Sequence, residues 1–176
     1  FLLEQDRGNP LPYRLNRILK WGNIAGSIPN DNGRTMFPAP YPHVVEGLKE
    51  MLAGQRWADL MGVGEEAFSS DSGLLWLDLQ RYICAALQPQ GGNFAACARA
   101  IRIELAMLLQ RSPDLPNLTF EDGTPFADAM TKEWIAAEVM PSLGGGGGGL
   151  GMAAIKKKGD VGEEQKQAEA LLAEGK

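Results

Sequence analysis

Three carboxylates around one turn are the side chains of this sequence whose types and spacing could support catalysis. They are Glu121, Asp122 and Asp128. A hydrolase acting on a glycan, such as cell-wall glycan, needs two carboxyl groups that face each other about 5–10 Å apart. A simpler interpretation is available, because Asp122 precedes Gly123 as in a turn and Asp128 stands before a helix-forming stretch as an N-cap. We favour these structural roles and keep the hydrolase as an alternative.

The chain has a single histidine, so catalysis by a Ser–His–Asp or Cys–His arrangement could run only through His43. His43 follows Pro42, which suits the first turn of a helix. The positive end of the helix dipole disfavours an imidazolium there. We therefore expect a surface or packing histidine, and a metal site with several histidine ligands is excluded by composition.

The other residues that could react or bind a cofactor also fit structural roles. Cys84 and Cys97 lie in apolar, helix-patterned surroundings and are expected to be buried free thiols, which agrees with a reducing compartment such as the cytoplasm. Residues 62–67 match a dinucleotide fingerprint, but that motif must follow a strand, and here it lies within a helical stretch. We expect no enzymatic activity, no cofactor and no bound metal.

Charge and hydropathy exclude two further classes of partner. Lys and Arg together number 17 and Asp and Glu number 22, so the net charge is −5. Binding to nucleic acid or to an anionic membrane surface needs clustered basic residues. No apolar run approaches the ~20 residues of a membrane span. We expect neither nucleic-acid binding nor direct membrane insertion.

Apolar residues at helical spacing, separated by Pro and Gly, predict an all-α fold, a bundle of about six helices followed by a flexible tail. A long Pro/Gly-rich loop is expected over residues 22–42, and a short extended piece over 118–120. Residues 69–72 and Asn93 are candidate N-caps. The helices are expected at residues 13–21, 42–53, 56–68, 74–88, 93–111 and 127–140.

Two of these helices carry apolar stripes that indicate where they pack. In the first, an apolar stripe is formed by Leu15, Ile18, Leu19 and Trp21, and the basic residues Arg14, Arg17 and Lys20 point elsewhere. The helix at 74–88 is apolar nearly all round, which is typical of a bundle centre or a subunit interface. The candidate protein-interface residues on and beside it are Leu75, Trp76, Leu79, Tyr82 and Ile83.

The glycines divide the chain into two parts. Ten of the 22 fall in residues 144–176, six of them as one run from Gly144 to Gly149. Such a run has no side chains to pack and behaves as a flexible linker. We expect a helical domain over 1–143. Residues 144–176 are expected to be a polyglycine linker and the start of a polar helical segment that leads to a missing C-terminal domain.

Four sequence blocks, in this order, resemble the TssA (ImpA/VasJ) proteins of the bacterial type VI secretion system. The match spans roughly residues 1–140. The polyglycine run is not recognised as a feature of that family. The blocks are residues 9–17 (NPLPYRLNR) followed by Trp21; residues 33–35 (GRT) leading into 38–40 (PAP); residues 76–82 (WLDLQRY); and residues 120–128 (FEDGTPFAD) with Thr131 and Trp134.

This resemblance implies a structural component of the secretion apparatus in the bacterial cytoplasm. TssA-like proteins act at the baseplate or at the distal end of the growing tail, where they coordinate tube and sheath assembly. The chain resembles their helical middle domain, which tends to pair, so a homodimer is expected. Sheath, tube, baseplate and membrane-complex proteins are the implied partners of the full-length protein.

A third possibility is a peptide-groove adaptor. In that case the aromatic residues and the Pro-rich loop at 36–42 would receive or donate a peptide segment.

Overall fold

The computed structural model describes residues 6–144. The polyglycine linker and the polar segment expected at 144–176 lie outside the described residues, apart from Gly144, and so does the segment 1–5. All statements below concern the described part of the chain.

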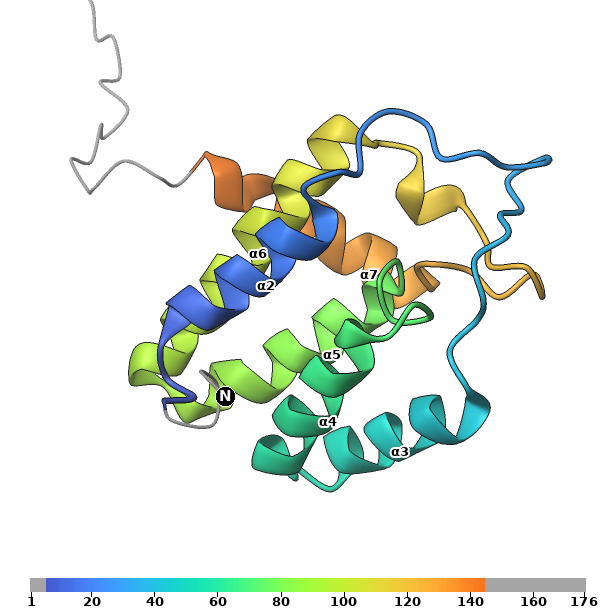
Figure 1. Ribbon diagram of the computed structural model, residues 1–176. Coiled ribbons are helices and arrows are strands. Elements are labelled where there is room, and N and C mark those ends of the chain that lie inside the picture. The colour runs from blue at the N-terminus through green and yellow to red at the C-terminus, as the bar shows by residue number, and fades with distance from the viewer. Residues whose placement is uncertain (1–5, 145–176) are drawn as a thin grey trace, which may run out of the picture. The chain divides into compact units, whose positions relative to one another are not determined.

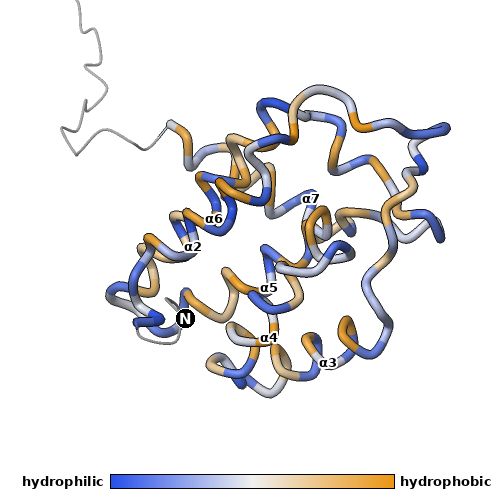
Figure 2. Tube along the Cα trace, viewed as in Figure 1, coloured by the Kyte–Doolittle hydropathy of each residue, from blue (hydrophilic) through white to orange (hydrophobic). Residues whose placement is uncertain are grey.

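An all-α architecture is confirmed, and residues 6–144 form six α-helices and short 3-10 and π turns. Hydrophobic residues recur along each helix rather than in one segment (Figure 2). The α-helices are α2 (Pro10–Trp21), α3 (Pro42–Ala53), α4 (Trp57–Ser69), α5 (Leu77–Leu87), α6 (Gly92–Arg111) and α7 (Ala129–Trp134); the short turns are η1 (Gln88–Gln90), η2 (Leu115–Asn117), η3 (Ile135–Val139) and η4 (Met140–Leu143).

Helix α5 occupies the centre of the bundle. It contacts α6 on one side and α3 and α4 on the other, and α7 packs near it as well. Helix α2 runs alongside α6 (Figure 1). A helix in this position is covered by neighbours all round, which explains why α5 is apolar on nearly every side.

The starts of the first two helices follow from local sequence. The Asn9 side chain accepts a hydrogen bond from the Leu11 N–H, and Pro10 occupies the first turn. Helix α2 therefore begins three residues earlier than the expected start at residue 13, because the first turn of a helix tolerates residues without a free N–H. Helix α3 begins at Pro42 and ends before Gly54, as predicted.

Helix α5 begins at Leu77, later than the expected start at residue 74, and none of the candidates at 69–72 caps it. Its first N–H is satisfied from a distance: the Leu77 N–H donates to the Phe126 carbonyl at 2.8 Å. Gly73 lies so close to α4 that a Cβ there would meet the Ala67 carbonyl oxygen. The chain therefore passes α4 in a turn before the helix can begin.

Two other local expectations are corrected. Asn93 does not cap α6; the N-cap is Gly91, whose positive φ of 67° suits glycine. The last helix does not run regularly to residue 140, since α7 ends at Trp134 and continues as a π turn and then a 3-10 turn. Pro141 has no N–H to donate to the carbonyl four residues earlier, so regular α-helical bonding cannot pass through it.

The long Pro/Gly-rich loop has a defined path, because it is bonded to the segment after α6. Thr119 donates to the Gly33 carbonyl at 2.9 Å and accepts from the Thr35 N–H at 3.0 Å. Isolated bridges pair Arg34 with Thr119 and Thr119 with Pro125. The expected extended piece at 118–120 is thus present as bridges, and it holds the loop in place (Figure 1).

Candidate functional site

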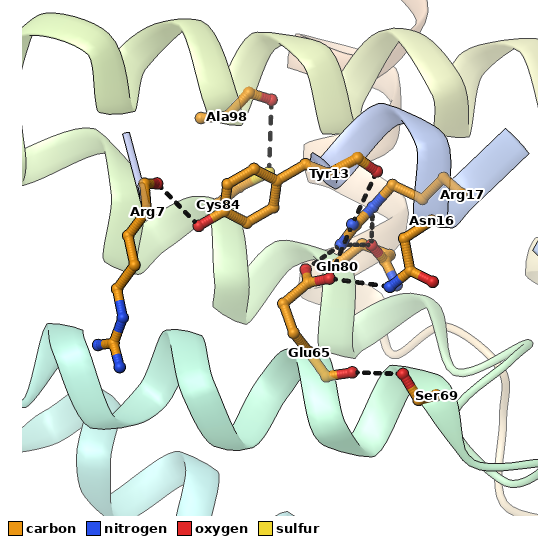
Figure 3. A network of polar contacts seen from close by, with 9 residues as sticks. All are labelled: Arg7, Tyr13, Asn16, Arg17, Glu65, Ser69, Gln80, Cys84 and Ala98. Atoms are coloured by element: carbon orange, nitrogen blue, oxygen red, sulfur yellow. Dashed lines mark hydrogen bonds and ion pairs between the residues drawn. The ribbon is translucent and has the colours of Figure 1, made fainter. Parts of the chain in front are cut away.

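Helix α2 faces the bundle with an arginine at the middle of its buried side. Arg17 has no solvent-exposed surface. Its guanidinium donates to both carboxylate oxygens of Glu65, at 2.6 and 3.1 Å, and to Gln80 Oε1 at 2.8 and 3.0 Å (Figure 3). A further bond goes to the Tyr13 carbonyl. The Arg17 guanidinium therefore links three helices, α2, α4 and α5.

The aromatic rings beside Arg17 complete its surroundings. The guanidinium lies 4.8 Å from the centre of the Phe68 ring, a cation–π distance. Tyr13 donates its hydroxyl proton to the Arg7 carbonyl at 3.1 Å, and burial raises the pKa of this phenol well above its ordinary value. The Gln80 Nε2 group is buried and has no hydrogen-bond partner in the described part of the chain. The contacts of Arg17 are thus structural ones that join neighbouring helices, and its side chain is fully buried.

A second polar cluster joins α5 to the segment before α7. Asp78 accepts from the Asp128 N–H at 2.8 Å. Asp128 caps α7 by accepting from the Thr131 N–H at 2.6 Å, and Arg81 donates to Asp128 at 3.1 Å and to Thr131 at 2.8 Å. The N-terminal cap of α7 is therefore held on α5, which fixes the position of the preceding turn.

Burial raises the pKa of the Asp78 carboxyl above its ordinary value, and the charge of Asp128 adds to this rise. Because the folded state then holds its proton to a higher pH than the unfolded state does, the free energy of unfolding falls as pH rises from about 4 through the raised pKa. Asp78→Asn is expected to remove this part of the pH dependence. Urea unfolding of the wild-type protein and of the Asp78→Asn variant between pH 4 and 7 measures this difference. If the free energies of unfolding of the two proteins changed in parallel with pH, Asp78 would not be the group responsible.

A third contact joins the loop after α2 to the turn that carries the acidic residues. Arg34 donates to the Glu121 carbonyl at 2.7 Å, and the Thr35 hydroxyl donates to the Thr119 carbonyl at 2.8 Å. Each of the four sequence blocks therefore bonds to another part of the fold. Their polar residues hold the bundle together.

Two of the three carboxylates considered for hydrolysis, Asp122 and Asp128, have the structural roles favoured above. Asp122 accepts from the Thr124 N–H at 2.8 Å, which lowers the pKa of Asp122, and it also accepts from the Thr124 hydroxyl at 3.0 Å. Glu121 is exposed, and Asp128 is the cap of α7. Asp122 therefore stabilises the turn, and Asp128 stabilises the start of α7.

The structure also locates the histidine, the two cysteines and the motif that resembles a dinucleotide fingerprint. His43 is exposed in the first turn of α3, and its ring stacks on Tyr41 with 5.7 Å between the ring centres. Cys84 and Cys97 are buried free thiols, as predicted, and burial raises the pKa of Cys84 to about 12. The fingerprint at 62–67 lies inside α4. No group of three or more metal-ligating side chains occurs among residues 6–144.

The five candidate interface residues lie in the core of the chain itself. The interface was expected on the condition that the chain leaves part of this apolar helix uncovered, and the neighbouring helices cover it. A contact with a second copy therefore needs other residues, and pairing itself stays a prediction. None of the five side chains exceeds 3% exposure: Leu75, Trp76, Leu79, Tyr82 and Ile83.

Helix α2, in contrast, carries four of the exposed large apolar side chains in the described part of the chain. The face directed inward carries Tyr13, Arg17 and Trp21 at four-residue spacing. Of the expected stripe only Trp21 is buried, and Leu15, Ile18 and Leu19 point outward, which corrects the sequence-based interpretation of this helix for those three residues. A second face spaced at i, i+4 and i+8 around Arg17 was the signal for this in the sequence. The outward residues, called the α2 stripe below, are Leu11 (55% exposed), Leu15 (39%), Ile18 (45%) and Leu19 (78%).

Comparison with known proteins gives the family. In the described part of the chain no helix is both long and apolar enough to span a bilayer. No curated protein matches the chain. A family model described as "Type VI secretion, EvfE, EvfF, ImpA, BimE, VC_A0119, VasJ" matches residues 1–176. The resemblance carried by the four sequence blocks is thereby confirmed, and the chain belongs to the ImpA/VasJ family of type VI secretion components.

Proposed function

We propose that this chain is a non-catalytic assembly module of the type VI secretion apparatus, a helical spacer that pairs with a second copy of itself. The observation that carries the pairing is the α2 stripe. Four large apolar side chains on one helix face are left exposed by the rest of residues 6–144, although the same helix buries an arginine on its other side. Contiguous exposed apolar surface of this kind marks an interaction site.

The stripe suits a second copy because a two-fold axis presents the same surface to itself. Leu11, Leu15 and Ile18 follow one another at helical spacing, so two antiparallel copies of α2 can interdigitate along the stripe. The apolar surface also continues onto the neighbouring helix. Ile18 and the half-exposed Met107 of α6 line one hollow of about 240 Å³.

An ion pair lies at the edge of this apolar surface. Arg14 lies beside the stripe, with half of its side chain exposed, and is paired with the nearly buried Glu104 at 2.9 Å. Charged residues at the rim of an apolar patch are typical of a protein–protein interface. We place the contacts with sheath, tube, baseplate and membrane-complex proteins in the full-length protein, in the bacterial cytoplasm.

Leu15→Glu is expected to convert a dimer to a monomer, because a carboxylate at the centre of the apolar contact would have to be buried without a partner. Light scattering after size exclusion measures the mass, which should fall from twice that of the chain to that of a single chain.

Met130→Glu is the matched control, since Met130 is 64% exposed on α7, away from the stripe. This variant should remain a dimer. A wild-type chain that is monomeric at high micromolar concentration, or a Leu15→Glu variant that still pairs, would refute pairing through α2.

A further inference from the structure

A second surface, separate from the α2 stripe, lies between the start of α3 and the outer face of α4. It is an apolar groove of about 300 Å³, within the usual range of ligand pockets. Three segments form it: the end of the Pro-rich loop with the first turn of α3, one face of α4, and the connection before α5. The residues that matter here, called the α3–α4 groove below, are Tyr41, Val44, Val63, Glu66, Ala67 and Trp76.

We infer that the α3–α4 groove binds a peptide segment of a protein partner in which a bulky aliphatic side chain stands next to Lys or Arg. The inference does not depend on pairing through α2. It rests on the apolar walls of the groove, on its exposed aromatic residue and on its charge.

The walls of the groove supply the site for the aliphatic side chain. Val44, Val63 and Ala67 are only partly buried, and each packs on the core. Trp76 is buried, and its indole N–H is directed to Asp78 at 3.4 Å, so its polar edge is already bonded inside the fold. An apolar side chain that enters the groove would displace water from these surfaces without leaving a donor unpaired.

Tyr41 supplies an aromatic contact at the groove. It is 67% exposed and held in place by its stacking on His43 and by its position before the first turn of α3. The Tyr41 carbonyl accepts from the Val44 and Val45 N–H groups, which anchors the backbone under the ring. A large aromatic that is exposed yet anchored loses little conformational entropy on binding, which is why tyrosine is enriched at interfaces.

The charge of the groove selects the flanking residue. Glu66 is exposed and forms no ion pair or hydrogen bond with the rest of the described chain. Asp71 is exposed in the connection before α5, between Ser70 and Ser72, which also line the groove. No Lys or Arg lines the groove among the described residues. A lysine or arginine beside the aliphatic anchor would pair with Glu66, whereas an acidic neighbour would be repelled.

Nuclear magnetic resonance titration of the full chain tests this with two synthetic peptides, acetyl-Gly-Leu-Lys-Lys-Leu-Gly-amide and the same peptide with Glu in place of Lys. We expect the lysine peptide to shift the amide signals of Tyr41, Val63 and Ala67 in a saturable way. The glutamate peptide should bind at least tenfold more weakly. Shifts spread over other surfaces, or equal binding of both peptides, would overturn the inference.

Two variants locate the interaction. Glu66→Gln should weaken binding of the lysine peptide about two- to fivefold, the effect of losing one exposed ion pair. Glu50→Gln, an exposed carboxylate of α3 that does not line the groove, should leave the affinity unchanged. Ala67→Trp should fill the groove and abolish the shifts, while an unchanged circular dichroism spectrum shows that the bundle is intact.

The same titration on Leu15→Glu separates this inference from the proposed pairing. Peptide binding that persists in this variant supports a groove independent of α2. Binding that is lost in Leu15→Glu would place the peptide on the α2 surface, and binding of wild-type affinity in Glu66→Gln would likewise refute the α3–α4 groove.

Discussion

Replacing Glu65 by leucine is expected to lower the free energy of unfolding by about 3–5 kcal/mol, the usual effect of removing one partner from a buried ion pair. The Arg17 guanidinium would remain without solvent contact and would keep only the Gln80 amide oxygen and the Tyr13 carbonyl as acceptors. Neither of these acceptors carries a charge. Urea unfolding followed by tryptophan fluorescence measures the loss.

Two controls separate this effect from lost packing. The double variant Arg17→Met, Glu65→Leu removes both charges of this ion pair, so much of the lost stability should return. Asp59→Leu removes an ion pair with Arg56 in which more than half of each side chain is exposed, and it should cost less than about 1 kcal/mol. A Glu65→Leu variant as stable as Asp59→Leu would show that Arg17 reaches solvent.

Phe126→Ala is expected to cost about 3–5 kcal/mol as well, by a different mechanism. The Phe126 ring is fully buried, 4.5 Å from the centre of the Phe120 ring. Its removal would leave a cavity where the turn of the fourth sequence block packs. The Phe126 carbonyl also holds the first N–H of α5, so hydrogen exchange at Leu77 should accelerate together with the loss of stability.

Met130→Ala is the matched control for this variant, because Met130 is an exposed apolar residue four positions further along the chain. Its effect should stay within about 0.5 kcal/mol of the wild type. Equal effects of the two substitutions, or an unchanged exchange rate at Leu77, would mean that the turn does not pack on α5 in solution.

The buried charge also explains why hydropathy alone predicts the wrong orientation for α2. Hydropathy alone assigns Leu15 and Ile18 to the core and Arg17 to solvent. The partners that reverse this assignment, Glu65 and Gln80, lie 48 and 63 residues further along the chain. These two partners cannot be identified from the sequence around Arg17. Only a fold that brings α4 and α5 beside α2 can make burial of the arginine favourable.

The interface expected on α5 differs from the structure for the same reason. Periodicity showed correctly that the helix is apolar on nearly every side. It could not tell whether its own chain or a second copy covers it, because both remove the same surface from water. The packing of α3, α4, α6 and α7 around α5 supplies the answer.

The sequence by itself determined the all-α class, most helix boundaries, the turn at Asp122 and the cap at Asp128. These depend on proline, glycine and side chains that act on backbone groups within a few residues. The sequence also indicated the family, because the four blocks and their order can be read from it directly. The tertiary structure decided which face of α2 is buried, where α5 begins and what remains exposed. Each of these depends on a contact between residues far apart in the chain, and such a contact forms only when the whole bundle does.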